Sequence, residues 1–260
     1  MAPIDILYGR QAVHEALRAR RRHFYSLSLA SGVKQIGIVA DIQTLAREVN
    51  CRVQQVDRAQ FDKMLPGANH QGVALESSPY PYSNLGEVFA HARSQDEPPF
   101  LLLLDHLEDP QNVGTLLRTA EAVGVHGVFL PDRRAVGITP AVSNSSAGAV
   151  EHLRVVHVTN IARTLADFKQ RGVWVAGLDN QPEAKDLLQS DFTGKLALVI
   201  GAESSGLSRL TRETCDWLVR IPLSGKIESL NASVAGSAAL IVANSARKAG
   251  KQEKNQEAFQ

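Results

Sequence analysis

The chain has 260 residues, 44% of them hydrophobic, and its 28 basic residues nearly balance 27 acidic ones to leave a formal net charge of +1. This composition fits a globular protein with one large domain or two unequal ones. It excludes a membrane-spanning chain, because the longest apolar runs, such as residues 100–104, are far too short to cross a bilayer. The N-terminus has no continuous apolar stretch, so we expect a cytoplasmic protein. Cys51 and Cys215 lie outside any metal-ligand spacing and form no disulfide framework.

The small net charge hides an uneven distribution. Residues 1–78 carry 10 basic against 7 acidic residues, a balance of +3, whereas the remainder carries 18 against 20, a balance of −2. The densest basic cluster consists of Arg18, Arg20, Arg21 and Arg22. Such a cluster suits phosphate contacts in RNA, and it equally suits a solvated helix end. Both interpretations remain open from the sequence.

The first 78 residues alternate helical and extended patterns and predict a small α/β domain. The expected helices cover residues 11–20, 42–48 and 57–65, and the expected strands cover 25–30, 52–56 and 72–76. The next stretch, 79–98, is rich in Pro and Ser and predicts a linker that carries a short helix at 85–92. We therefore place a domain boundary there.

From residue 99 to 248 apolar runs alternate with helical patterns. The expected strands are 100–105, 127–130, 154–158, 173–178, 196–201 and 217–223, and the expected helices are 113–122, 141–149, 161–170, 210–214 and one beginning near Asn231. This alternation predicts an α/β fold with a mostly parallel sheet covered by helices on both faces. Residues 249–260 lack an apolar period and predict a disordered tail.

Ligands of parallel sheets usually bind at the carboxyl ends of the strands, and three polar motifs follow predicted strands. The first motif, DHLEDPQNVGTLLR at 105–118, starts a turn at Asp109 and Pro110. Asn112 can cap the helix that follows, and Arg118 lies further along that helix. Taken alone, the motif equally describes a capped helix with a surface arginine.

The second motif, LVIGAESSGL at 198–207, is an apolar strand that ends in a glycine-rich turn. Gly201 and Gly206 permit a close approach of the backbone to a ligand, and Glu203 can accept hydrogen bonds from a ligand or hold an arginine. Between them stand the small residues Ser204 and Ser205. The turn is neither the dinucleotide pattern GxGxxG nor a phosphate-binding loop, which requires a following lysine.

The third motif, IPLSGKIESLNASVA at 221–235, leads from a strand through a polar turn into an alanine-rich helix. The first amides of a helix have no intrahelical partner, so Ser229, Asn231 and the neighbouring N–H groups can form a polar rim that binds a ligand. The simpler alternative is a helix capped by serine or asparagine.

Together and in this order, the three motifs resemble those of the SpoU or TrmH family of ribose 2′-O-methyltransferases, which belongs to the SPOUT superfamily. The matching residues are Asn112 with Arg118, the turn 201–206 and the run 229–233. The resemblance implies a C-terminal trefoil knot, S-adenosyl-L-methionine as the cofactor and a homodimer. General topology rules disfavour a knot, and no sequence period could have indicated one.

The N-terminal segment adds to this resemblance. YGRQAVHEAL at 8–17 and HQGVAL at 70–75 look like the ribosomal-protein L30e-like domain with which some family members bind their substrate. Those members methylate a guanosine of the large-subunit ribosomal RNA. The resemblance therefore implies an RNA-binding domain at 1–78 and methyl transfer to the ribose 2′-hydroxyl of a guanosine in 23S ribosomal RNA.

The resemblance also implies roles for individual residues. Main-chain groups near Gly201, Ile221 and Leu230 are expected to bind the cofactor, while the two apolar side chains enclose its adenine. The expected catalytic set is Arg118, Asn112, Glu203, Ser229 and Asn231. In this set Glu203 orients Arg118 or holds the ligand, Asn112 supports the same network, and the last two residues contact substrate phosphate or shape the pocket.

Arg118 is the residue that the resemblance assigns to activating the 2′-hydroxyl. Literal proton abstraction is costly, because bringing a guanidinium from a pKa of about 13 to about 7 needs roughly 8 kcal/mol. A charged Arg118 that stabilises the developing alkoxide and holds an RNA phosphate is the less demanding hypothesis. No metal is expected, because the histidines lack zinc-ligand spacing and methyl transfer from a sulfonium needs none.

Three other functions remain as alternatives. A noncatalytic RNA-binding assembly factor could keep this fold, although the complete set of motif residues argues against it. A nucleotide-dependent oxidoreductase is disfavoured by the missing dinucleotide pattern. Within the methyltransferases, transfer RNA or another ribosomal RNA site could be the substrate, and the N-terminal domain favours ribosomal RNA.

Overall fold

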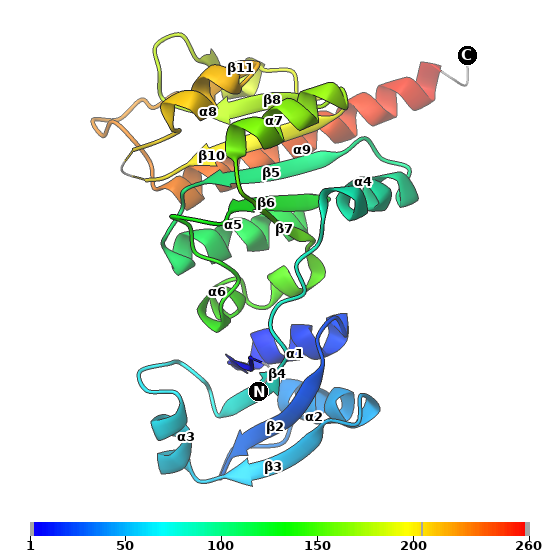
Figure 1. Ribbon diagram of the computed structural model, residues 1–260, viewed down its shortest axis with the longest axis vertical. Helices are drawn as coiled ribbons and strands as arrows, with labels where there is room; N and C mark the ends of the chain where they lie inside the picture. Colours follow the sequence, from blue (N-terminus) through cyan, green and yellow to red (C-terminus); the bar gives the residue numbers. More distant parts are fainter. Residues whose placement is uncertain (1–2, 204, 258–260) are drawn as a thin grey trace. The chain divides into compact units, whose positions relative to one another are not determined.

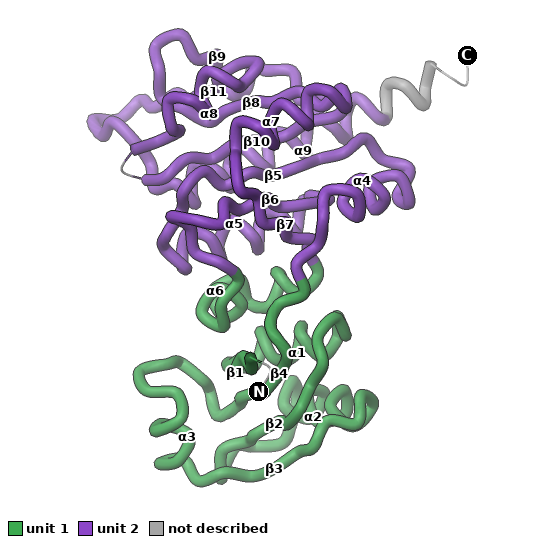
Figure 2. The backbone as a smooth tube through the Cα atoms, viewed as in Figure 1, with its two compact units in different colours: residues 1–81, 138–152 green, residues 82–137, 153–260 purple. Residues whose placement is uncertain are grey.

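The chain folds into two compact units (Figure 2). The computed structural model describes residues 3–203 and 205–257, with side chains through Lys251. The first unit contains residues 1–81 together with 138–152, and the second contains 82–137 together with the chain from 153 onward. The sequence placed 138–152 in the methyltransferase domain, whereas the structure groups this segment with the N-terminal unit.

The first unit is built on a four-stranded sheet of order β1-β4-β2-β3. Its strands are β1 (Asp5–Tyr8), β4 (Val73–Ser77), β2 (Phe24–Ala30) and β3 (Arg52–Val56). β4 pairs antiparallel with β1 and β2, while β2 and β3 run parallel. β1 was not predicted, because four residues are too few to show an alternating pattern.

Helices bury the apolar side chains of this sheet. The unit contains α1 (Arg10–Ala19), α2 (Ile38–Glu48), α3 (Arg58–Met64), α6 (Pro140–Ser145) and the 3₁₀ turn η1 (Ala149–His152). α1 buries Ala12, Val13, Ala16 and Leu17, a spacing that places one helical face in the core. The core joins these residues to Leu7, Leu27 and Leu75 of the strands and to Ile42 of α2.

Arg22, the last residue of the arginine cluster that precedes β2, is part of the core and is not free for RNA. Arg22 is buried and pairs with Glu151, at 2.8 Å between Nη2 and Oε1, and with Asp5, at 2.8 Å between Nη1 and Oδ2. Burial alone would lower the pKa of Arg22, but the hydrogen bonds and charges of the two carboxylates outweigh this effect and raise the pKa. Arg18 and Arg20 form ion pairs with Glu15 and Glu48. The solvated-end interpretation was therefore wrong for Arg22, which is part of the core.

The second unit is built on a seven-stranded sheet of order β7-β6-β5-β10-β8-β11-β9. All its strand pairs are parallel. The strands are β5 (Phe100–Asp105), β6 (Gly127–Pro131), β7 (Val155–Val158), β8 (Trp174–Leu178), β9 (Lys185–Asp186), β10 (Leu196–Gly201) and β11 (Trp217–Arg220). This architecture confirms the predicted α/β fold with its mostly parallel sheet.

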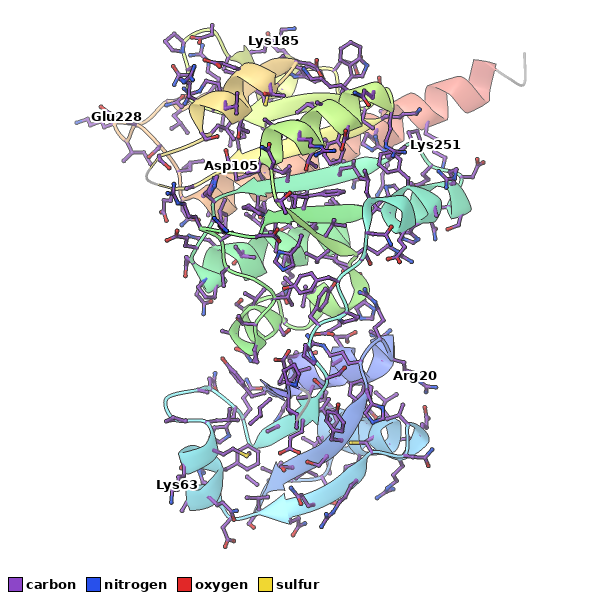
Figure 3. The ribbon with its side chains drawn as sticks, in the orientation of Figure 1. Arg20, Lys63, Asp105, Lys185, Glu228 and Lys251 are labelled. Carbon is purple, nitrogen blue, oxygen red and sulfur yellow. The ribbon has the colours of Figure 1, made fainter. Side chains whose placement is uncertain are left out.

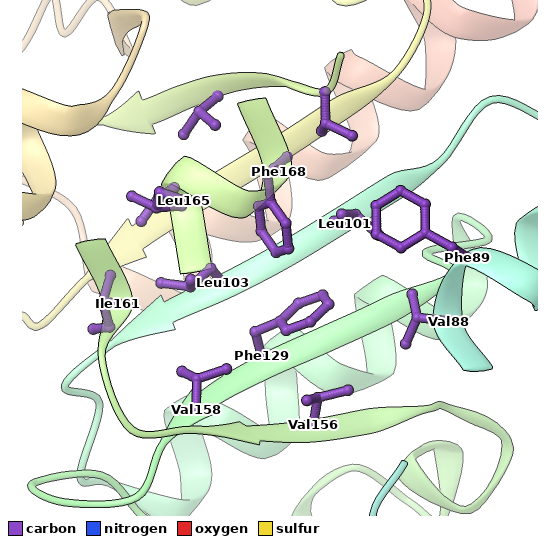
Figure 4. Packing of buried hydrophobic residues seen from close by; sticks show 14 of the residues in the cluster. Val88, Phe89, Leu101, Leu103, Phe129, Val156, Val158, Ile161, Leu165 and Phe168 are labelled. Carbon is purple, nitrogen blue, oxygen red and sulfur yellow. The ribbon is translucent and has the colours of Figure 1, made fainter. Parts of the chain in front are cut away.

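Both faces of the sheet are covered (Figure 1). Leu101 and Leu103 of β5 join a core with α4 (Leu85–Ser94) and α7 (Ile161–Gln170) on one face (Figure 4). α5 (Pro110–Ala122) and α9 (Ala232–Glu257) pack together on the other face. There Gly236 of α9 lies so close to the sheet that a Cβ atom would stand 2.4 Å from Ile200 Cδ1. β5 and β10 are thus buried on both sides, which explains their continuous apolar sequences.

Four elements of the second unit differ from the prediction. The strand expected at 217–223 ends at Arg220, because the following residues contain Pro222 and turn away from the sheet. The short elements β9 and η2 (Leu187–Gln189) were not predicted. The tail expected to be disordered from 249 continues α9 to Glu257, in a stretch rich in the good helix formers Lys, Gln and Glu. Residues 258–260 lie outside the described part of the chain.

Candidate functional site

The carboxyl ends of β8, β10 and β11 surround a pocket of about 640 Å³ of empty space, part of it open to solvent. We call it the cofactor pocket. The expected site residues Gly201, Glu203, Ile221, Ser229 and Leu230 line it. Asp105 marks the end of β5, level with Gly201 of β10, and Glu228 lies in the loop before α9 (Figure 3). The pocket therefore lies at the carboxyl ends of the strands, where parallel α/β proteins bind ligands.

Gly201 has to be a glycine because the chain folds back on it directly. Ala202 and Gly206 exchange hydrogen bonds, with N–O distances of 3.1 and 2.8 Å. A Cβ atom on Gly201 would stand 2.2 Å from the carbonyl carbon of Gly206, and Gly206 itself has a φ of +62°. This tight turn holds the backbone of β10 against the pocket. Ser204, at the tip of the motif, lies outside the described residues.

A triangle of side chains from three separate segments lies at the edge of the pocket. Asn112 Nδ2 donates to Glu203 Oε2 at 3.2 Å. Asn231 Nδ2 donates to Asn112 Oδ1 and to Glu203 Oε1, both at 3.0 Å. The three motifs of the sequence therefore meet at one place. Glu203 holds Asn112 and Asn231, not Arg118, so the expected orientation of Arg118 by Glu203 does not occur within this chain.

Asn231 has a second role as the cap of α9. Its Oδ1 accepts from the amides of Ser233 and Val234 and from the Ser233 hydroxyl, at 2.9, 3.3 and 2.6 Å. The capping oxygen and the network nitrogen belong to one amide group. Asn231 therefore couples the start of α9 to Glu203, and an ionised aspartate could supply the cap but not the donor.

The outer wall of the cofactor pocket is the exposed loop that joins β11 to α9. Asn180 Nδ2 donates to the carbonyl of Glu228 at 2.8 Å and ties the loop to the end of β8. The neighbouring Asp179 forms an ion pair with Arg212, at 2.7 Å between Oδ2 and Nε. Asp179 and Asn180 both line the pocket. Sequence reasoning missed them, although their position directly after the predicted strand 173–178 could have indicated them.

Arg118 stands apart from this arrangement. Arg118 is exposed on α5 and has no ion pair among the described residues. It lines neither the cofactor pocket nor the second hollow that adjoins this pocket and is described next. Arg118 lies six positions after Asn112 on the helix. At this spacing the side chain of Arg118 points about 120° away from that of Asn112 around the helix axis. Within this chain the structure brings together Asn112, Glu203 and Asn231 but leaves Arg118 outside.

A second hollow adjoins the cofactor pocket, and we call it the side pocket. The two share Ala202, Glu203, Gly206 and Ala232 as a common wall. The remaining polar lining includes Asp105, His106, Glu108, Asp109, Asn112 and Arg134. The loop of Arg134 is held against the first motif, since Val136 N donates to the Leu107 carbonyl at 3.0 Å. Of the neighbouring residues Arg133 and Arg134, only Arg134 lines this pocket.

The first unit has a hollow of its own, lined by basic side chains. Arg10, Lys34 and Arg58 line it, together with the amides Asn69 and Gln71. The guanidinium of Arg10 is positioned by Gln71, whose carbonyl accepts from Nε at 3.3 Å and whose side chain accepts from the Arg10 amide at 3.0 Å. The remaining N–H groups of Arg10 are thereby left to meet an anion.

The fold and site define a parallel α/β protein with a ligand pocket at the carboxyl ends of its strands, and the sequence places it in a family. Residues 99–241 match the model of the SpoU rRNA Methylase family, and residues 6–83 match that of the RNA 2′-O ribose methyltransferase substrate binding domain. The chain belongs to the SpoU family of RNA methyltransferases, as its three motifs indicated.

Relatives and solved structures agree with this assignment. A Bacillus subtilis protein named YacO, assigned to the TrmH family of tRNA/rRNA methyltransferases, is 44% identical over 231 residues, which cover 89% of this chain and 91% of the relative. The structure of the SpoU methyltransferase AviRb from Streptomyces viridochromogenes is similar with a TM-score of 0.77, at 24% identity, covering 95% of this chain and 91% of AviRb. Its complex with the cofactor AdoMet gives a TM-score of 0.75 at 24% identity, with coverages of 93% and 90%.

Two kinds of feature are absent from the described residues. No helix among them is long and apolar enough to cross a membrane. Within the same residues, no three His, Cys, Asp or Glu side chains gather as metal ligands would.

Proposed function

We propose that this protein transfers a methyl group from S-adenosyl-L-methionine to the ribose 2′-hydroxyl of a guanosine in 23S ribosomal RNA. The observation that carries the proposal is the meeting of Asn112, Glu203 and Asn231 at the rim of the cofactor pocket. Three motifs far apart in the sequence converge there, on an edge of the sheet that suits a ligand.

The lining of the cofactor pocket suits S-adenosyl-L-methionine. Ile200, Ile221, Leu223 and Leu230 offer apolar surface to an adenine, while the backbone of the loops supplies hydrogen bonds. Asp179 is a negatively charged wall residue that can meet a cationic or hydroxyl-bearing part of the cofactor. AviRb, with the same fold, is described in complex with AdoMet. We also propose that the loop at 221–231 is the last pass of a trefoil knot.

When bound, the cofactor supplies an electrophilic methyl group on a sulfonium. The ribose oxygen attacks the methyl carbon, the C–S bond breaks with its electron pair going to sulfur, and the hydroxyl proton leaves to water or a neighbouring phosphate. The protein has to hold the ribose oxygen in line and stabilise its developing charge. Arg118 performs this role as a fixed positive charge, and the Asn112–Glu203–Asn231 triangle keeps the rim of the pocket rigid.

Because Arg118 faces away from its own cofactor pocket, we propose that it serves the pocket of a second subunit in a homodimer. A surface for such pairing exists on α9, where Val234 and Ile241 are 53% and 55% exposed one heptad apart. These two side chains lie on one face of the helix, and a partner chain that covered them would bury apolar surface. In this dimer each site takes its pocket from one chain and its arginine from the other.

The RNA is bound by the first unit. Arg10, Lys34 and Arg58 concentrate positive charge around one hollow, which suits the phosphates of a folded RNA. Residues 6–83 match the substrate-binding model, which supports this role. The presence of this unit favours ribosomal RNA over transfer RNA as the substrate.

The test is methyl transfer to defined RNA. The purified protein is incubated with labelled cofactor and with unmodified transcripts of 23S ribosomal RNA and of transfer RNAs, and 2′-O-methyl groups are then mapped. We expect one methylated guanosine in the 23S transcript. If only transfer RNA were methylated, the proposed reaction would stand but the substrate would be transfer RNA and not 23S ribosomal RNA. Absence of both methylation and cofactor binding in calorimetry would instead support the noncatalytic RNA-binding alternative.

A further inference from the structure

We propose that the side pocket receives the base of the target nucleotide and that Glu108 makes it selective for guanine. The inference rests on the proposed function, because it assigns a substrate site beside the cofactor pocket. The two hollows share the wall formed by Ala202, Glu203, Gly206 and Ala232. A nucleotide whose ribose faces the cofactor can therefore place its base in the side pocket.

The charges of the side pocket fit a base better than a phosphate. Four carboxylates line it, against one guanidinium and one imidazole; these residues are Asp105, Glu108, Asp109, Glu203, Arg134 and His106. A phosphate would meet carboxylates everywhere except beside Arg134, whereas a neutral base that offers N–H donors would be attracted to them. Enzymes that act on a nucleotide commonly bind its base, turned out of the stack, through its Watson–Crick edge.

Three of the four carboxylates already have partners. Asp105 is buried, accepts from the Ser208 amide at 2.9 Å and contacts His106 Nδ1. Asp109 caps α5 by accepting from its first amides at 3.2 and 3.1 Å. Glu203 is held by the two asparagines described above.

Glu108 is different. It is exposed, lines the side pocket, and has neither a hydrogen bond nor an ion pair with any described residue. It is thus the carboxylate that is available to a ligand.

The chemistry of a free carboxylate selects among the four bases. An ionised carboxylate accepts through two oxygens and donates nothing. Guanine alone presents two adjacent donors, N1–H and the 2-amino group, which match those two oxygens. Adenine and cytosine place a ring acceptor beside their amino group, and uracil flanks its one donor with two carbonyls, so each would set an acceptor against Glu108.

Arg134 gives the phosphate of the same nucleotide a place to bind. It is the one guanidinium among the described residues that line the side pocket, and its loop is fixed to the loop of Glu108 by the hydrogen bond from Val136 to Leu107. The adjacent Arg133 is exposed but does not line the pocket. In this proposal Glu108 recognises the base, and Arg134 binds the phosphate of the RNA backbone.

The test uses a short RNA that contains the mapped target site, synthesised with guanosine or with inosine, which lacks the 2-amino group. We expect wild-type protein to lose about tenfold to a hundredfold in kcat/KM on the inosine RNA. The Glu108→Gln variant should show a similar loss of kcat/KM on the guanosine RNA. Its kcat/KM should fall little further when inosine replaces guanosine in the RNA. Cofactor affinity in calorimetry should be unchanged, which also shows that the variant is folded.

Matched variants control for charge. Glu121→Gln removes an exposed carboxylate of α5 outside both pockets and should behave as wild type. Arg134→Gln should raise KM equally for the guanosine and inosine RNAs, while Arg133→Gln should not.

A Glu108→Gln loss that is as large on inosine RNA as on guanosine RNA would overturn the inference and leave the proposed function standing. A methylated nucleotide other than guanosine would overturn the inference together with the guanosine target, and would leave 2′-O-methyl transfer standing. A wild-type protein that methylates no RNA would instead refute the proposed function itself, and the inference with it.

Discussion

The two units arrange their strands differently, and this difference decides where each can hold a ligand. All strand pairs of the second unit are parallel, so the loops that leave its strands gather at the carboxyl ends. The loops after β8, β10 and β11 enclose the cofactor pocket there, and the loop after β5 lines the side pocket. The first unit has a mixed sheet whose carboxyl ends do not gather in this way, and its basic hollow is formed by loops on either side of β2 and β4. The second unit can therefore bind a ligand through backbone groups at the carboxyl ends of its strands, and the first unit through charged side chains around its basic hollow.

The units also stabilise their polar interiors differently. The first unit buries a charged pair, Arg22 with Glu151, which brings the segment 138–152 into its core. At its functional edge the second unit has a partly exposed triangle of two amides and one carboxylate. Removing one member of a buried charge pair leaves an unpaired charge, which costs far more than losing one amide hydrogen bond.

The largest effect is expected at the turn of the second unit. Gly201→Ala places a methyl group 2.2 Å from the Gly206 carbonyl carbon, so the turn has to open. We expect cofactor affinity in calorimetry to fall by about a hundredfold or more, because the pocket depends on backbone position. Gly225→Ala is the matched control, since no atom lies within 4 Å of its added Cβ. Normal affinity of Gly201→Ala would break the claim that main-chain geometry makes the pocket.

A large loss of stability is expected in the first unit. Arg22→Met leaves Glu151 buried without its partner and should lower the free energy of unfolding by about 3–5 kcal/mol. Replacing both residues with methionine should restore much of this loss. Arg20→Met, which breaks the exposed pair with Glu48, should cost less than about 1 kcal/mol. Hydrogen exchange resolves the first unit separately, and equal protection in the Arg22 and Arg20 variants would contradict the buried-pair account.

A smaller effect is expected at the triangle. Asn231→Asp keeps the oxygen that caps α9 but replaces the donor to Asn112 and Glu203 with a second negative charge. We expect methyl transfer to fall by about tenfold to a hundredfold while the melting temperature changes little. Asn244→Asp, the same change further along α9, serves as the control. If Asn231→Asp kept both normal activity and normal stability, Asn231 would act only as a cap.

The smallest effects concern the basic hollow. Arg10→Gln, Lys34→Gln and Arg58→Gln should each weaken RNA binding severalfold without changing cofactor affinity. Each should also reduce the slope of log affinity against log salt by about 0.7 to 0.9 for every phosphate that the variant no longer neutralises. Arg52→Gln, an exposed change on β3 outside the hollow, is the control. If Arg52→Gln reduces the salt dependence of RNA affinity as much as the three variants in the hollow do, RNA binding depends on net charge and not on this hollow.

The parallel sheet could be predicted from the sequence because its strands are continuous apolar runs and its helices are periodic. The position of Gly201 after a buried strand also indicated a close approach of backbone. The role of Arg22 could not be predicted, because its partner Glu151 lies 129 residues away and nothing local distinguishes it from Arg21. For the same reason the sequence did not show that 138–152 packs with the first unit.

The site was only partly visible in the sequence. Motif order identified Asn112, Glu203 and Asn231, but not that one asparagine both caps α9 and donates to the other two residues. The motif groups Arg118 with Asn112, but their spacing of six residues puts the two side chains on different faces of α5. The resemblance implied a homodimer, and the position of Arg118 outside the cofactor pocket of its own chain supports the proposal that two chains share the site.

Mixing two inactive variants tests the central claim, an active site shared between chains. Arg118→Ala and Gly201→Ala homodimers should each be inactive in methyl transfer. Exchanging their subunits should restore activity, because a mixed dimer combines the intact pocket of the Arg118→Ala chain with the intact arginine of the Gly201→Ala chain. If Arg118 served the pocket of its own chain, both sites of the mixed dimer would be defective. Recovery of methyl transfer on mixing is the predicted result, and continued inactivity of a verified mixed dimer would contradict it.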